Sequence, residues 1–177
     1  MSDIESTGKF LAFLVKDMLN SVAMSVEDLS LEELHYRVHG NANHIAFEAW
    51  HIARTSDNIV HFAFDREQPI WLRKGLHEAW NLPKVDQGTD MEPEVAYSLR
   101  FPEPMVLAGY IRDVAVAVES RIGNMKDDYL SAEVRVHPHG EISRIQALGQ
   151  VVIVHGSNHL GQINLARTFQ GKSSIGF

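Results

Sequence analysis

Four stretches of the sequence carry apolar residues at the spacing of an α-helix, and this pattern limits the possible fold more than any other feature. The stretches cover about 4–24, 43–66, 102–125 and 143–170. In each of them apolar side chains recur every three or four positions with polar residues in between, so each helix would bury one face. No segment shows the pattern of a strand. The sequence therefore predicts an all-α protein built as a four-helix bundle.

Residues that begin or end helices mark the limits of these stretches. Ser30–Glu33 reads as a capping box, which predicts a short helix after the first long one. Pro69 should end the second long helix because proline lacks the amide hydrogen that a helix interior needs. A proline at 102 or 104 suits the first turn of the third helix, and Ser143 is expected to cap the last.

The connection between the second and third long helices, 67–101, is long and irregular. It contains several proline and glycine residues together with Trp71, Trp80 and Tyr97. A long loop with aromatic residues is more often functional than idle. We expect short helical turns around 72–80. The connection 126–141 is polar and is predicted to be a loop.

Size and charge restrict the class of protein. The 177 residues suit one domain, 1–177, and the formal charge of −7 disfavours a nucleic-acid partner. No apolar run reaches the ~18 residues of a membrane span, and the first residues lack a signal-peptide pattern. A cytoplasmic location is therefore expected. The chain has no cysteine, so any thiol chemistry would use a thiol supplied from outside.

The chain contains ten histidines, and two pairs of them are separated by four residues. Chance alone supplies roughly 0.6 such pairs, so this helical spacing proves little. His35 and His39 lie in a short polar segment and are expected to be surface or loop residues. His155 and His159 lie in an apolar helical run, where two unpaired imidazoles would be costly to bury. They are either ligands of one metal ion or satisfied core histidines.

A metal site needs further ligands, because Zn²⁺ and similar ions prefer four to six. The best third candidate is His51, which lies in the middle of an apolar helix and can face the last helix across a bundle core. The alternative is a core histidine bound to a backbone carbonyl. The remaining histidines are expected to be structural or surface residues, namely His44, His61, His77, His137 and His139.

Other known catalytic patterns are missing from the sequence. There is no HExxH, no phosphate-binding glycine loop and no GxSxG nucleophile elbow. The ExxH pattern of di-iron bundles occurs once, as Glu48 to His51, and the second copy that such a site requires is absent. A mononuclear histidine site is thus the strongest hypothesis that the residues support.

Several segments together resemble the DinB/YfiT superfamily, in particular its DinB-like branch. The main ones are Trp50–Asp57 (WHIARTSD) and His155–Gln162 (HGSNHLGQ). Gln68–Trp71 (QPIW), Trp80–Pro83 (WNLP) and Tyr110 also match. Each motif alone is weak, but their order, spacing and helical placement are fairly specific. The resemblance covers nearly the whole chain.

The resemblance implies a four-helix bundle, often a homodimer, with three histidines holding one divalent ion such as Zn²⁺, Ni²⁺ or Fe²⁺. Carried over by position, the ligands are His51, His155 and His159. Relatives include mycothiol-dependent maleylpyruvate isomerase and bacillithiol transferases, which use the metal to activate a low-molecular-weight thiol. The resemblance therefore implies a metal-dependent thiol transferase or hydrolase acting on a small molecule. The competing hypothesis is a non-catalytic bundle that binds metal or a ligand, with a stress-related or assembly role.

Residues near the three histidines are candidates for catalytic or supporting roles. Gln162 and Asn158 are candidates for orienting a ligand or binding substrate, and Glu48 for a base, unless it is a solvated surface glutamate. Arg54 and Asp57 are expected to form an ion pair, with an anionic substrate as the alternative partner of Arg54. The two tryptophans at 71 and 80 either wall the mouth of a pocket or belong to ordinary packing.

Overall fold

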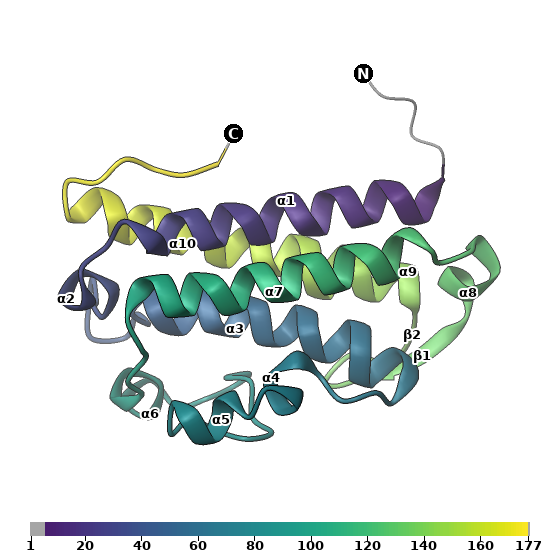
Figure 1. The fold of residues 1–177 in the computed structure, drawn as a ribbon, viewed down its shortest axis with the longest axis horizontal. Helices are drawn as coiled ribbons and strands as arrows, with labels where there is room; N and C mark the ends of the chain where they lie inside the picture. Colours follow the sequence, from purple (N-terminus) through teal and green to yellow (C-terminus); the bar gives the residue numbers. More distant parts are fainter. Residues whose placement is uncertain (1–5, 177) are drawn as a thin grey trace.

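The computed structural model describes residues 6–176 and contains four long helices that lie side by side (Figure 1). They are α1 (Thr7–Glu27), α3 (Ile45–Asp57), α7 (Pro104–Gly123) and α10 (His155–Phe169). π-helical turns extend two of them, with η1 (Asn58–Ala63) continuing α3 and η2 (Ala147–Val154) leading into α10. The predicted all-α four-helix bundle is confirmed. The expected start of the first helix at residue 4 lies outside the described residues.

The apolar stripes meet in one core at the centre of the bundle. α1 packs mainly against α7, and α10 packs mainly against α3. On α1 the side chains of Val15, Leu19 and Val22 are fully buried, as their helical spacing predicts. Every residue of α3 is buried. α3 is therefore the central helix, and any polar side chain on it needs a partner inside the protein.

Short helices fill the connections between the long ones. α2 (Leu31–Leu34) begins with the predicted capping box, in which Ser30 Oγ accepts from the Glu33 amide and the Glu33 carboxylate accepts from the Ser30 amide. The predicted helical turns near 72–80 are α4 (Ile70–Arg73) and α5 (Leu76–Ala79). Three more short helices are α6 (Pro93–Ser98), α8 (Asp127–Ser131) and α9 (Arg144–Gln146).

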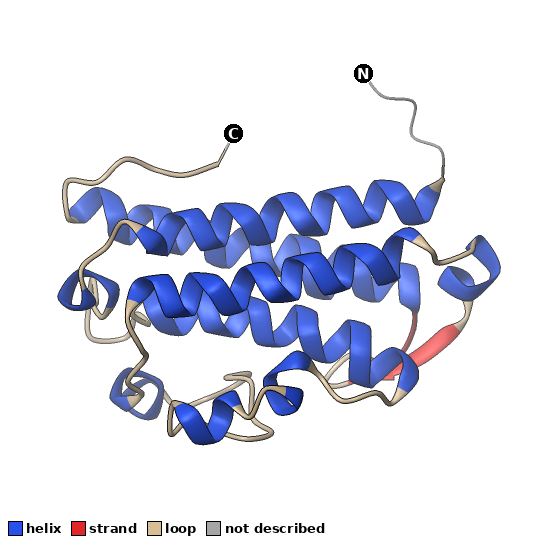
Figure 2. Ribbon diagram, viewed as in Figure 1, coloured by secondary structure: helices blue, strands red, loops and turns tan. Residues whose placement is uncertain are grey.

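The connection 126–141 differs from the sequence prediction, which found no strand there. β1 (Glu133–Val136) and β2 (Gly140–Ser143) form an antiparallel hairpin, drawn red in Figure 2. Val134 and Val136 are buried while the residues between and beside them are exposed. This alternation is the two-residue period of a half-buried strand, and four residues were too few for it to stand out in a mostly helical sequence.

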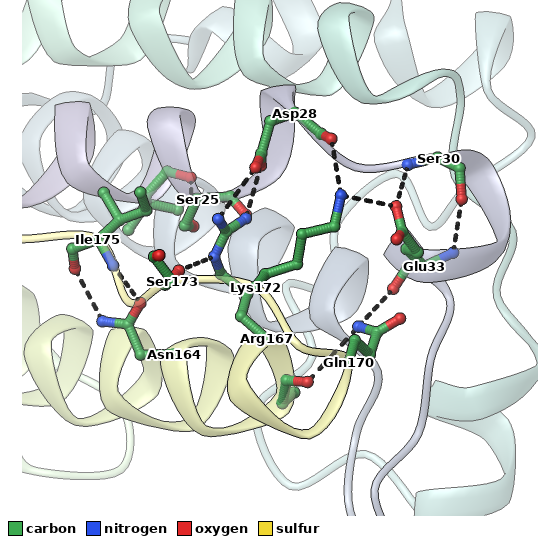
Figure 3. Close-up of polar contacts among 12 residues, drawn as sticks. Ser25, Asp28, Ser30, Glu33, Asn164, Arg167, Gln170, Lys172, Ser173 and Ile175 are labelled. Atoms are coloured by element: carbon green, nitrogen blue, oxygen red, sulfur yellow. Dashed lines mark hydrogen bonds and ion pairs between the residues drawn. The ribbon is translucent and has the colours of Figure 1, made fainter.

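The last described residues run back along the bundle and are tied to α1 and α10 (Figure 3). The Asn164 side chain donates to the Ile175 carbonyl and accepts from the Ile175 amide, both at 2.8 Å. Arg167 is buried, donates to the Ser173 and Ser25 carbonyls, and pairs with Asp28 at 2.6 Å. These contacts fix the end of α10 against α1.

Among the described residues, no helix is both long and apolar enough to cross a membrane.

Candidate metal centre

Three histidine side chains from two helices meet at one point in the bundle. His51 comes from α3, and His155 and His159 come from α10. Nε2 of His155 lies 3.2 Å from Nε2 of His51 and 2.9 Å from Nε2 of His159. One ring nitrogen from each residue lies within 4.8 Å of those of the other two. The three residues selected from the sequence are therefore brought together by the fold.

The orientation of His51 is set by a loop that crosses α3. Its Nδ1 lies 2.6 Å from the backbone oxygen of Gln87. A carbonyl only accepts, so Nδ1 carries the hydrogen and the lone pair of Nε2 points to the other two histidines. His51 is 4% exposed, and burial lowers its pKa, which favours the neutral ring.

The orientation of His159 is set by a carboxylate on α3. The Glu48 carboxylate lies against Nδ1 of His159, and its other oxygen accepts from Asn43 Nδ2 at 2.9 Å. A carboxylate beside Nδ1 favours the tautomer with hydrogen on Nδ1, which leaves a lone pair on Nε2. Glu48 is only 2% exposed. The surface-glutamate alternative is therefore wrong.

With these tautomers the three histidines have too few N–H donors for the contacts between their Nε2 atoms. Nε2 of His51 and Nε2 of His159 are both acceptors, and each faces Nε2 of His155. The single N–H that His155 can carry on Nε2 donates to only one of these two nitrogens. In at least one of the two contacts, therefore, two nitrogen lone pairs face each other. Burial, together with the neighbouring His159 and His51, lowers the pKa of His155 to about 4, so an extra proton is disfavoured. A cation between the rings would resolve this conflict.

The donor set and its spacing fit a divalent ion. Two nitrogens bound to one Zn²⁺ at about 2.0–2.1 Å lie roughly 3.3 Å apart in tetrahedral geometry. The observed separations of 3.2 Å and 2.9 Å are close to this value. Three imidazoles leave coordination positions free, and the side chain of His159 remains 18% exposed. The cluster is therefore in contact with solvent on the His159 side.

Local helix geometry places the two histidines of α10. η2 ends at Val154, immediately before His155. π-helical turns add a residue to a helical turn, so they shift the side chains that follow, and they occur often at functional sites. Gly156 lets α10 approach its neighbours closely, because a Cβ there would collide with the Met18 sulfur and lie 3.3 Å from Ile52. Neither feature is visible as a periodic pattern in the sequence.

Gly88 allows the loop over His51 to lie close to α3. Its φ is +96°, and a Cβ at this position would lie 2.7 Å from a ring carbon of Phe47 and 3.3 Å from Nδ1 of His51. Phe47 stacks parallel to the His51 ring, with centroids 6.0 Å apart. Only glycine combines this backbone angle with this space. The sequence did not indicate the contact of the Gln87 carbonyl, because a backbone carbonyl in a loop leaves no side-chain signal. It also did not indicate the contact of the Asn43 side chain with Glu48.

The other candidate residues take different positions. Gln162 lies on the same stripe of α10 as the two histidines, seven residues after His155, and is exposed. Asn158 is also exposed. Within residues 6–176 neither side chain forms a hydrogen bond to protein. Both face solvent beside the cluster.

The expected ion pair between Arg54 and Asp57 is absent from the described residues. The buried Asp57 carboxylate instead accepts from the amides of Ile70 and Trp71, at 2.9 and 3.0 Å. Arg54 is also buried and donates to the Val85 carbonyl at 3.2 Å. Spacing along a helix pairs side chains only when both point outward, and all of α3 is inside.

The tryptophans of the long connection belong to packing. Trp71 is fully buried, donates from Nε1 to the Pro83 carbonyl, and contacts Trp80 with ring centroids 5.5 Å apart. Tyr110 packs against both rings and donates to Asp57. The packed rings of Trp71, Trp80 and Tyr110 hold the connection 67–101 against the bundle.

Two further histidines are structural, as expected. His44 caps α3, where its Nδ1 accepts from the Phe47 amide at 3.1 Å. His61 is buried, and its Nδ1 lies 2.9 Å from the Asp57 carboxylate. His35 of the second spaced pair ends α2 and accepts from the Phe101 amide, while His39 is exposed. His35 and His39 therefore do not form a second cluster.

Comparison with known proteins supports the family suggested by the sequence motifs. A crystal structure described as the conserved protein of locus from Enterococcus faecalis has a similar fold, with a TM-score of 0.81 and 19% identity over 94% of this chain and 99% of that one. No curated protein sequence matches the chain. The family model of the DinB superfamily matches residues 15–163, a span that includes all three histidines of the cluster. The chain belongs to the DinB superfamily.

Proposed function

We propose that this protein is a divalent-metal-dependent enzyme in which His51, His155 and His159 hold one Zn²⁺, Ni²⁺ or Fe²⁺ ion. The observation that carries the proposal is the convergence of three Nε2 atoms, two of which are fixed as acceptors by Gln87 and Glu48. A part-buried arrangement of facing lone pairs is unfavourable without a cation.

A divalent ion in such a site lowers the pKa of a water or thiol beside it and so supplies a nucleophile near neutral pH. The chain has no cysteine, so a thiol would enter as a low-molecular-weight cosubstrate. The proposed reaction is transfer of that thiol to a small electrophilic molecule, or hydrolysis of a small molecule by water.

The residues of this chain have separate parts in the proposed reaction. The Gln87 carbonyl and the Glu48 carboxylate orient His51 and His159 through the ring nitrogens that face away from the centre. Glu48 is in contact with His159, which favours this orienting role over that of a free base. Gln162 has the proposed role of binding a polar group of the substrate, which its exposed position on the same stripe as His155 supports.

The activity can be tested with protein loaded with each of the three metals. Thiol consumption is measured with a panel of physiological thiols and small electrophiles, and hydrolysis with simple ester and amide substrates. We expect turnover that is lost in His159→Ala and kept in His39→Ala, whose side chain is exposed and outside the cluster. Inactivity of metal-loaded protein with every substrate would favour a non-catalytic metal-binding bundle instead.

We also propose that the protein is a cytoplasmic homodimer, as the family resemblance implies. Phe13, Leu165 and Phe169 keep 56–61% of their surface exposed, which supports a partner on the outer faces of α1 and α10. Light scattering after size-exclusion chromatography tests the stoichiometry.

A further inference from the structure

A second feature of the structure is a cavity of about 540 Å³ next to the histidine cluster. Its walls come from three parts of the chain, namely η1 with the residues that follow it, the loop 85–89 and the β1–β2 hairpin. The three histidines do not line it. The cavity is large enough for a small organic molecule.

Arginine side chains from two walls make this cavity cationic. Arg66 follows η1 and Arg135 lies on β1, and both line the cavity. Neither is in an ion pair among residues 6–176. Asp86 is the carboxylate in the lining, and one of its oxygens already accepts from the Gly88 amide at 2.7 Å. In a protein of formal charge −7, a concave surface with two free guanidinium groups concentrates anions locally.

Glu141 is the nearest competitor for Arg135. The two residues are directly paired across the hairpin, so their side chains lie on the same face. The Glu141 side chain is not part of the cavity lining and does not reach Arg135 within ion-pair distance. The guanidinium of Arg135 is thus available to an external carboxylate, with Glu141 weakening its attraction.

The remaining lining is both apolar and polar. Phe62 is 46% exposed, and the Arg66 guanidinium lies 5.2 Å from its ring centroid. The Gln87 side chain donates to Thr89 Oγ1 at 3.3 Å, while its amide oxygen has no hydrogen-bond partner among the described residues. An apolar ring in a cavity lined by two cations suits a molecule with an apolar body and an anionic end.

The wall between the cavity and the histidine cluster is held in place from the inside. The Val85 carbonyl accepts from buried Arg54, and the Gln87 carbonyl accepts from His51. These two bonds fix the same short loop to α3, with one face toward the histidines and the other toward the cavity. This wall of the cavity is therefore preformed, and a ligand against it lies beside the candidate metal centre.

We propose that this cavity binds a small organic carboxylate with an apolar body, whose carboxylate pairs with Arg66 and Arg135 and whose apolar part packs on Phe62. Binding itself depends on these residues alone. That this carboxylate is also the substrate class of the enzyme rests on the proposed function.

The test is calorimetric titration of the metal-loaded protein with benzoate, and with benzamide as the neutral molecule of the same shape. We expect benzoate to bind and benzamide to bind at least about tenfold more weakly, since a charge-assisted contact is lost. Arg66→Gln and Arg135→Gln should each weaken benzoate binding about tenfold. Arg73→Gln, which removes an exposed arginine outside the cavity, should leave it unchanged. Equal binding of both probes, or unchanged binding in both cavity variants, overturns the proposal.

Two further variants separate this site from the histidines and from folding defects. Glu141→Gln should strengthen benzoate binding, a gain that a misfolded protein does not produce; weaker or unchanged binding counts against the pairing of the carboxylate with Arg135. His155→Ala should retain benzoate binding. If binding is lost in His155→Ala and kept in Arg135→Gln, the carboxylate binds the metal centre and the cavity proposal is wrong. A parent protein that binds benzoate but takes up no metal after loading would contradict the proposed function alone.

Discussion

The carboxylate of Glu48 on α3 lies against Nδ1 of His159 on α10. This contact joins the two helices that supply the histidine cluster and fixes the free nitrogen of His159 toward the centre. It also gives a buried acid an interior partner, because Glu48 has no access to solvent beyond 2% of its surface.

Replacing Glu48 by glutamine should weaken metal binding without unfolding the protein. Glutamine fills the same space and can still bind Asn43, but it no longer places a negative charge beside His159. Loss of such a supporting group typically costs about 10–100-fold in metal affinity. Competition with a chromophoric chelator measures the change. Glu32→Gln, at an exposed site on α2, is the control, and equal affinity in both variants would show that Glu48 does not support the site.

Gly88→Ala should destabilise the loop over His51. The added Cβ would lie 2.7 Å from Phe47 at a φ of +96°, where alanine is strained. We expect the free energy of unfolding to fall by about 1–3 kcal/mol, as measured by urea denaturation. In Gly40→Ala the new Cβ meets nothing within 4 Å, so that variant should stay within about 0.5 kcal/mol of the parent. An unchanged free energy of unfolding in Gly88→Ala would contradict the requirement for glycine at this position.

Protonation of His44 should make stability depend on pH below neutrality. Burial, followed by the charge of His35, lowers the pKa of His44 from 6.5 to about 3. Between these values the unfolded chain binds a proton that the folded chain does not, so stability is complete above pH 6.5 and falls as the pH drops. This one group contributes about 1.4 kcal/mol per pH unit.

His44→Asn tests this dependence because asparagine can still cap α3 through its side-chain oxygen. Urea unfolding at pH 7 and pH 5 should show a smaller loss of stability in the variant than in the parent. The same loss in both proteins would assign the pH dependence to other groups.

Removal of the Asp57 carboxylate should loosen the start of the long connection. Asp57 accepts from two backbone amides of α4 and from Tyr110, and all of these groups are buried. Asp57→Ala leaves them without a partner, which should cost about 3 kcal/mol or more in thermal or urea unfolding. Asp113→Ala is the control, since its pair with Lys74 is exposed and worth little. Similar effects in both variants would contradict the anchoring role.

Much of the fold could be predicted because long amphipathic helices repeat apolar residues every three or four positions. The stripe containing Val15, Leu19 and Val22 is buried as expected. The capping box at Ser30 and Glu33 has the expected bonds in both directions. The β1–β2 hairpin was missed because β1 has only two alternating apolar residues, Val134 and Val136, and β2 has one, Ile142, which are too few to separate from chance.

The site was predictable only in part. The four-residue spacing on one helix indicated His155 and His159, and the apolar sequence around His51 indicated that residue. The contacts that orient these side chains, however, come from segments that are distant in sequence. The Gln87 carbonyl lies 36 residues from His51 along the chain. The prediction for Arg54 failed for a related reason, since its partner Val85 belongs to a loop that has no pattern in sequence.

The three-histidine metal site can be tested by measuring the metal content of purified protein by mass spectrometry. The variants are His51→Ala, His155→Ala and His159→Ala, with His39→Ala as the control. We predict about one divalent ion per chain in the parent and in the control, and little metal in each of the other three proteins. Full metal content in the three cluster variants, or no metal in the parent after loading with zinc, nickel or iron, would contradict it.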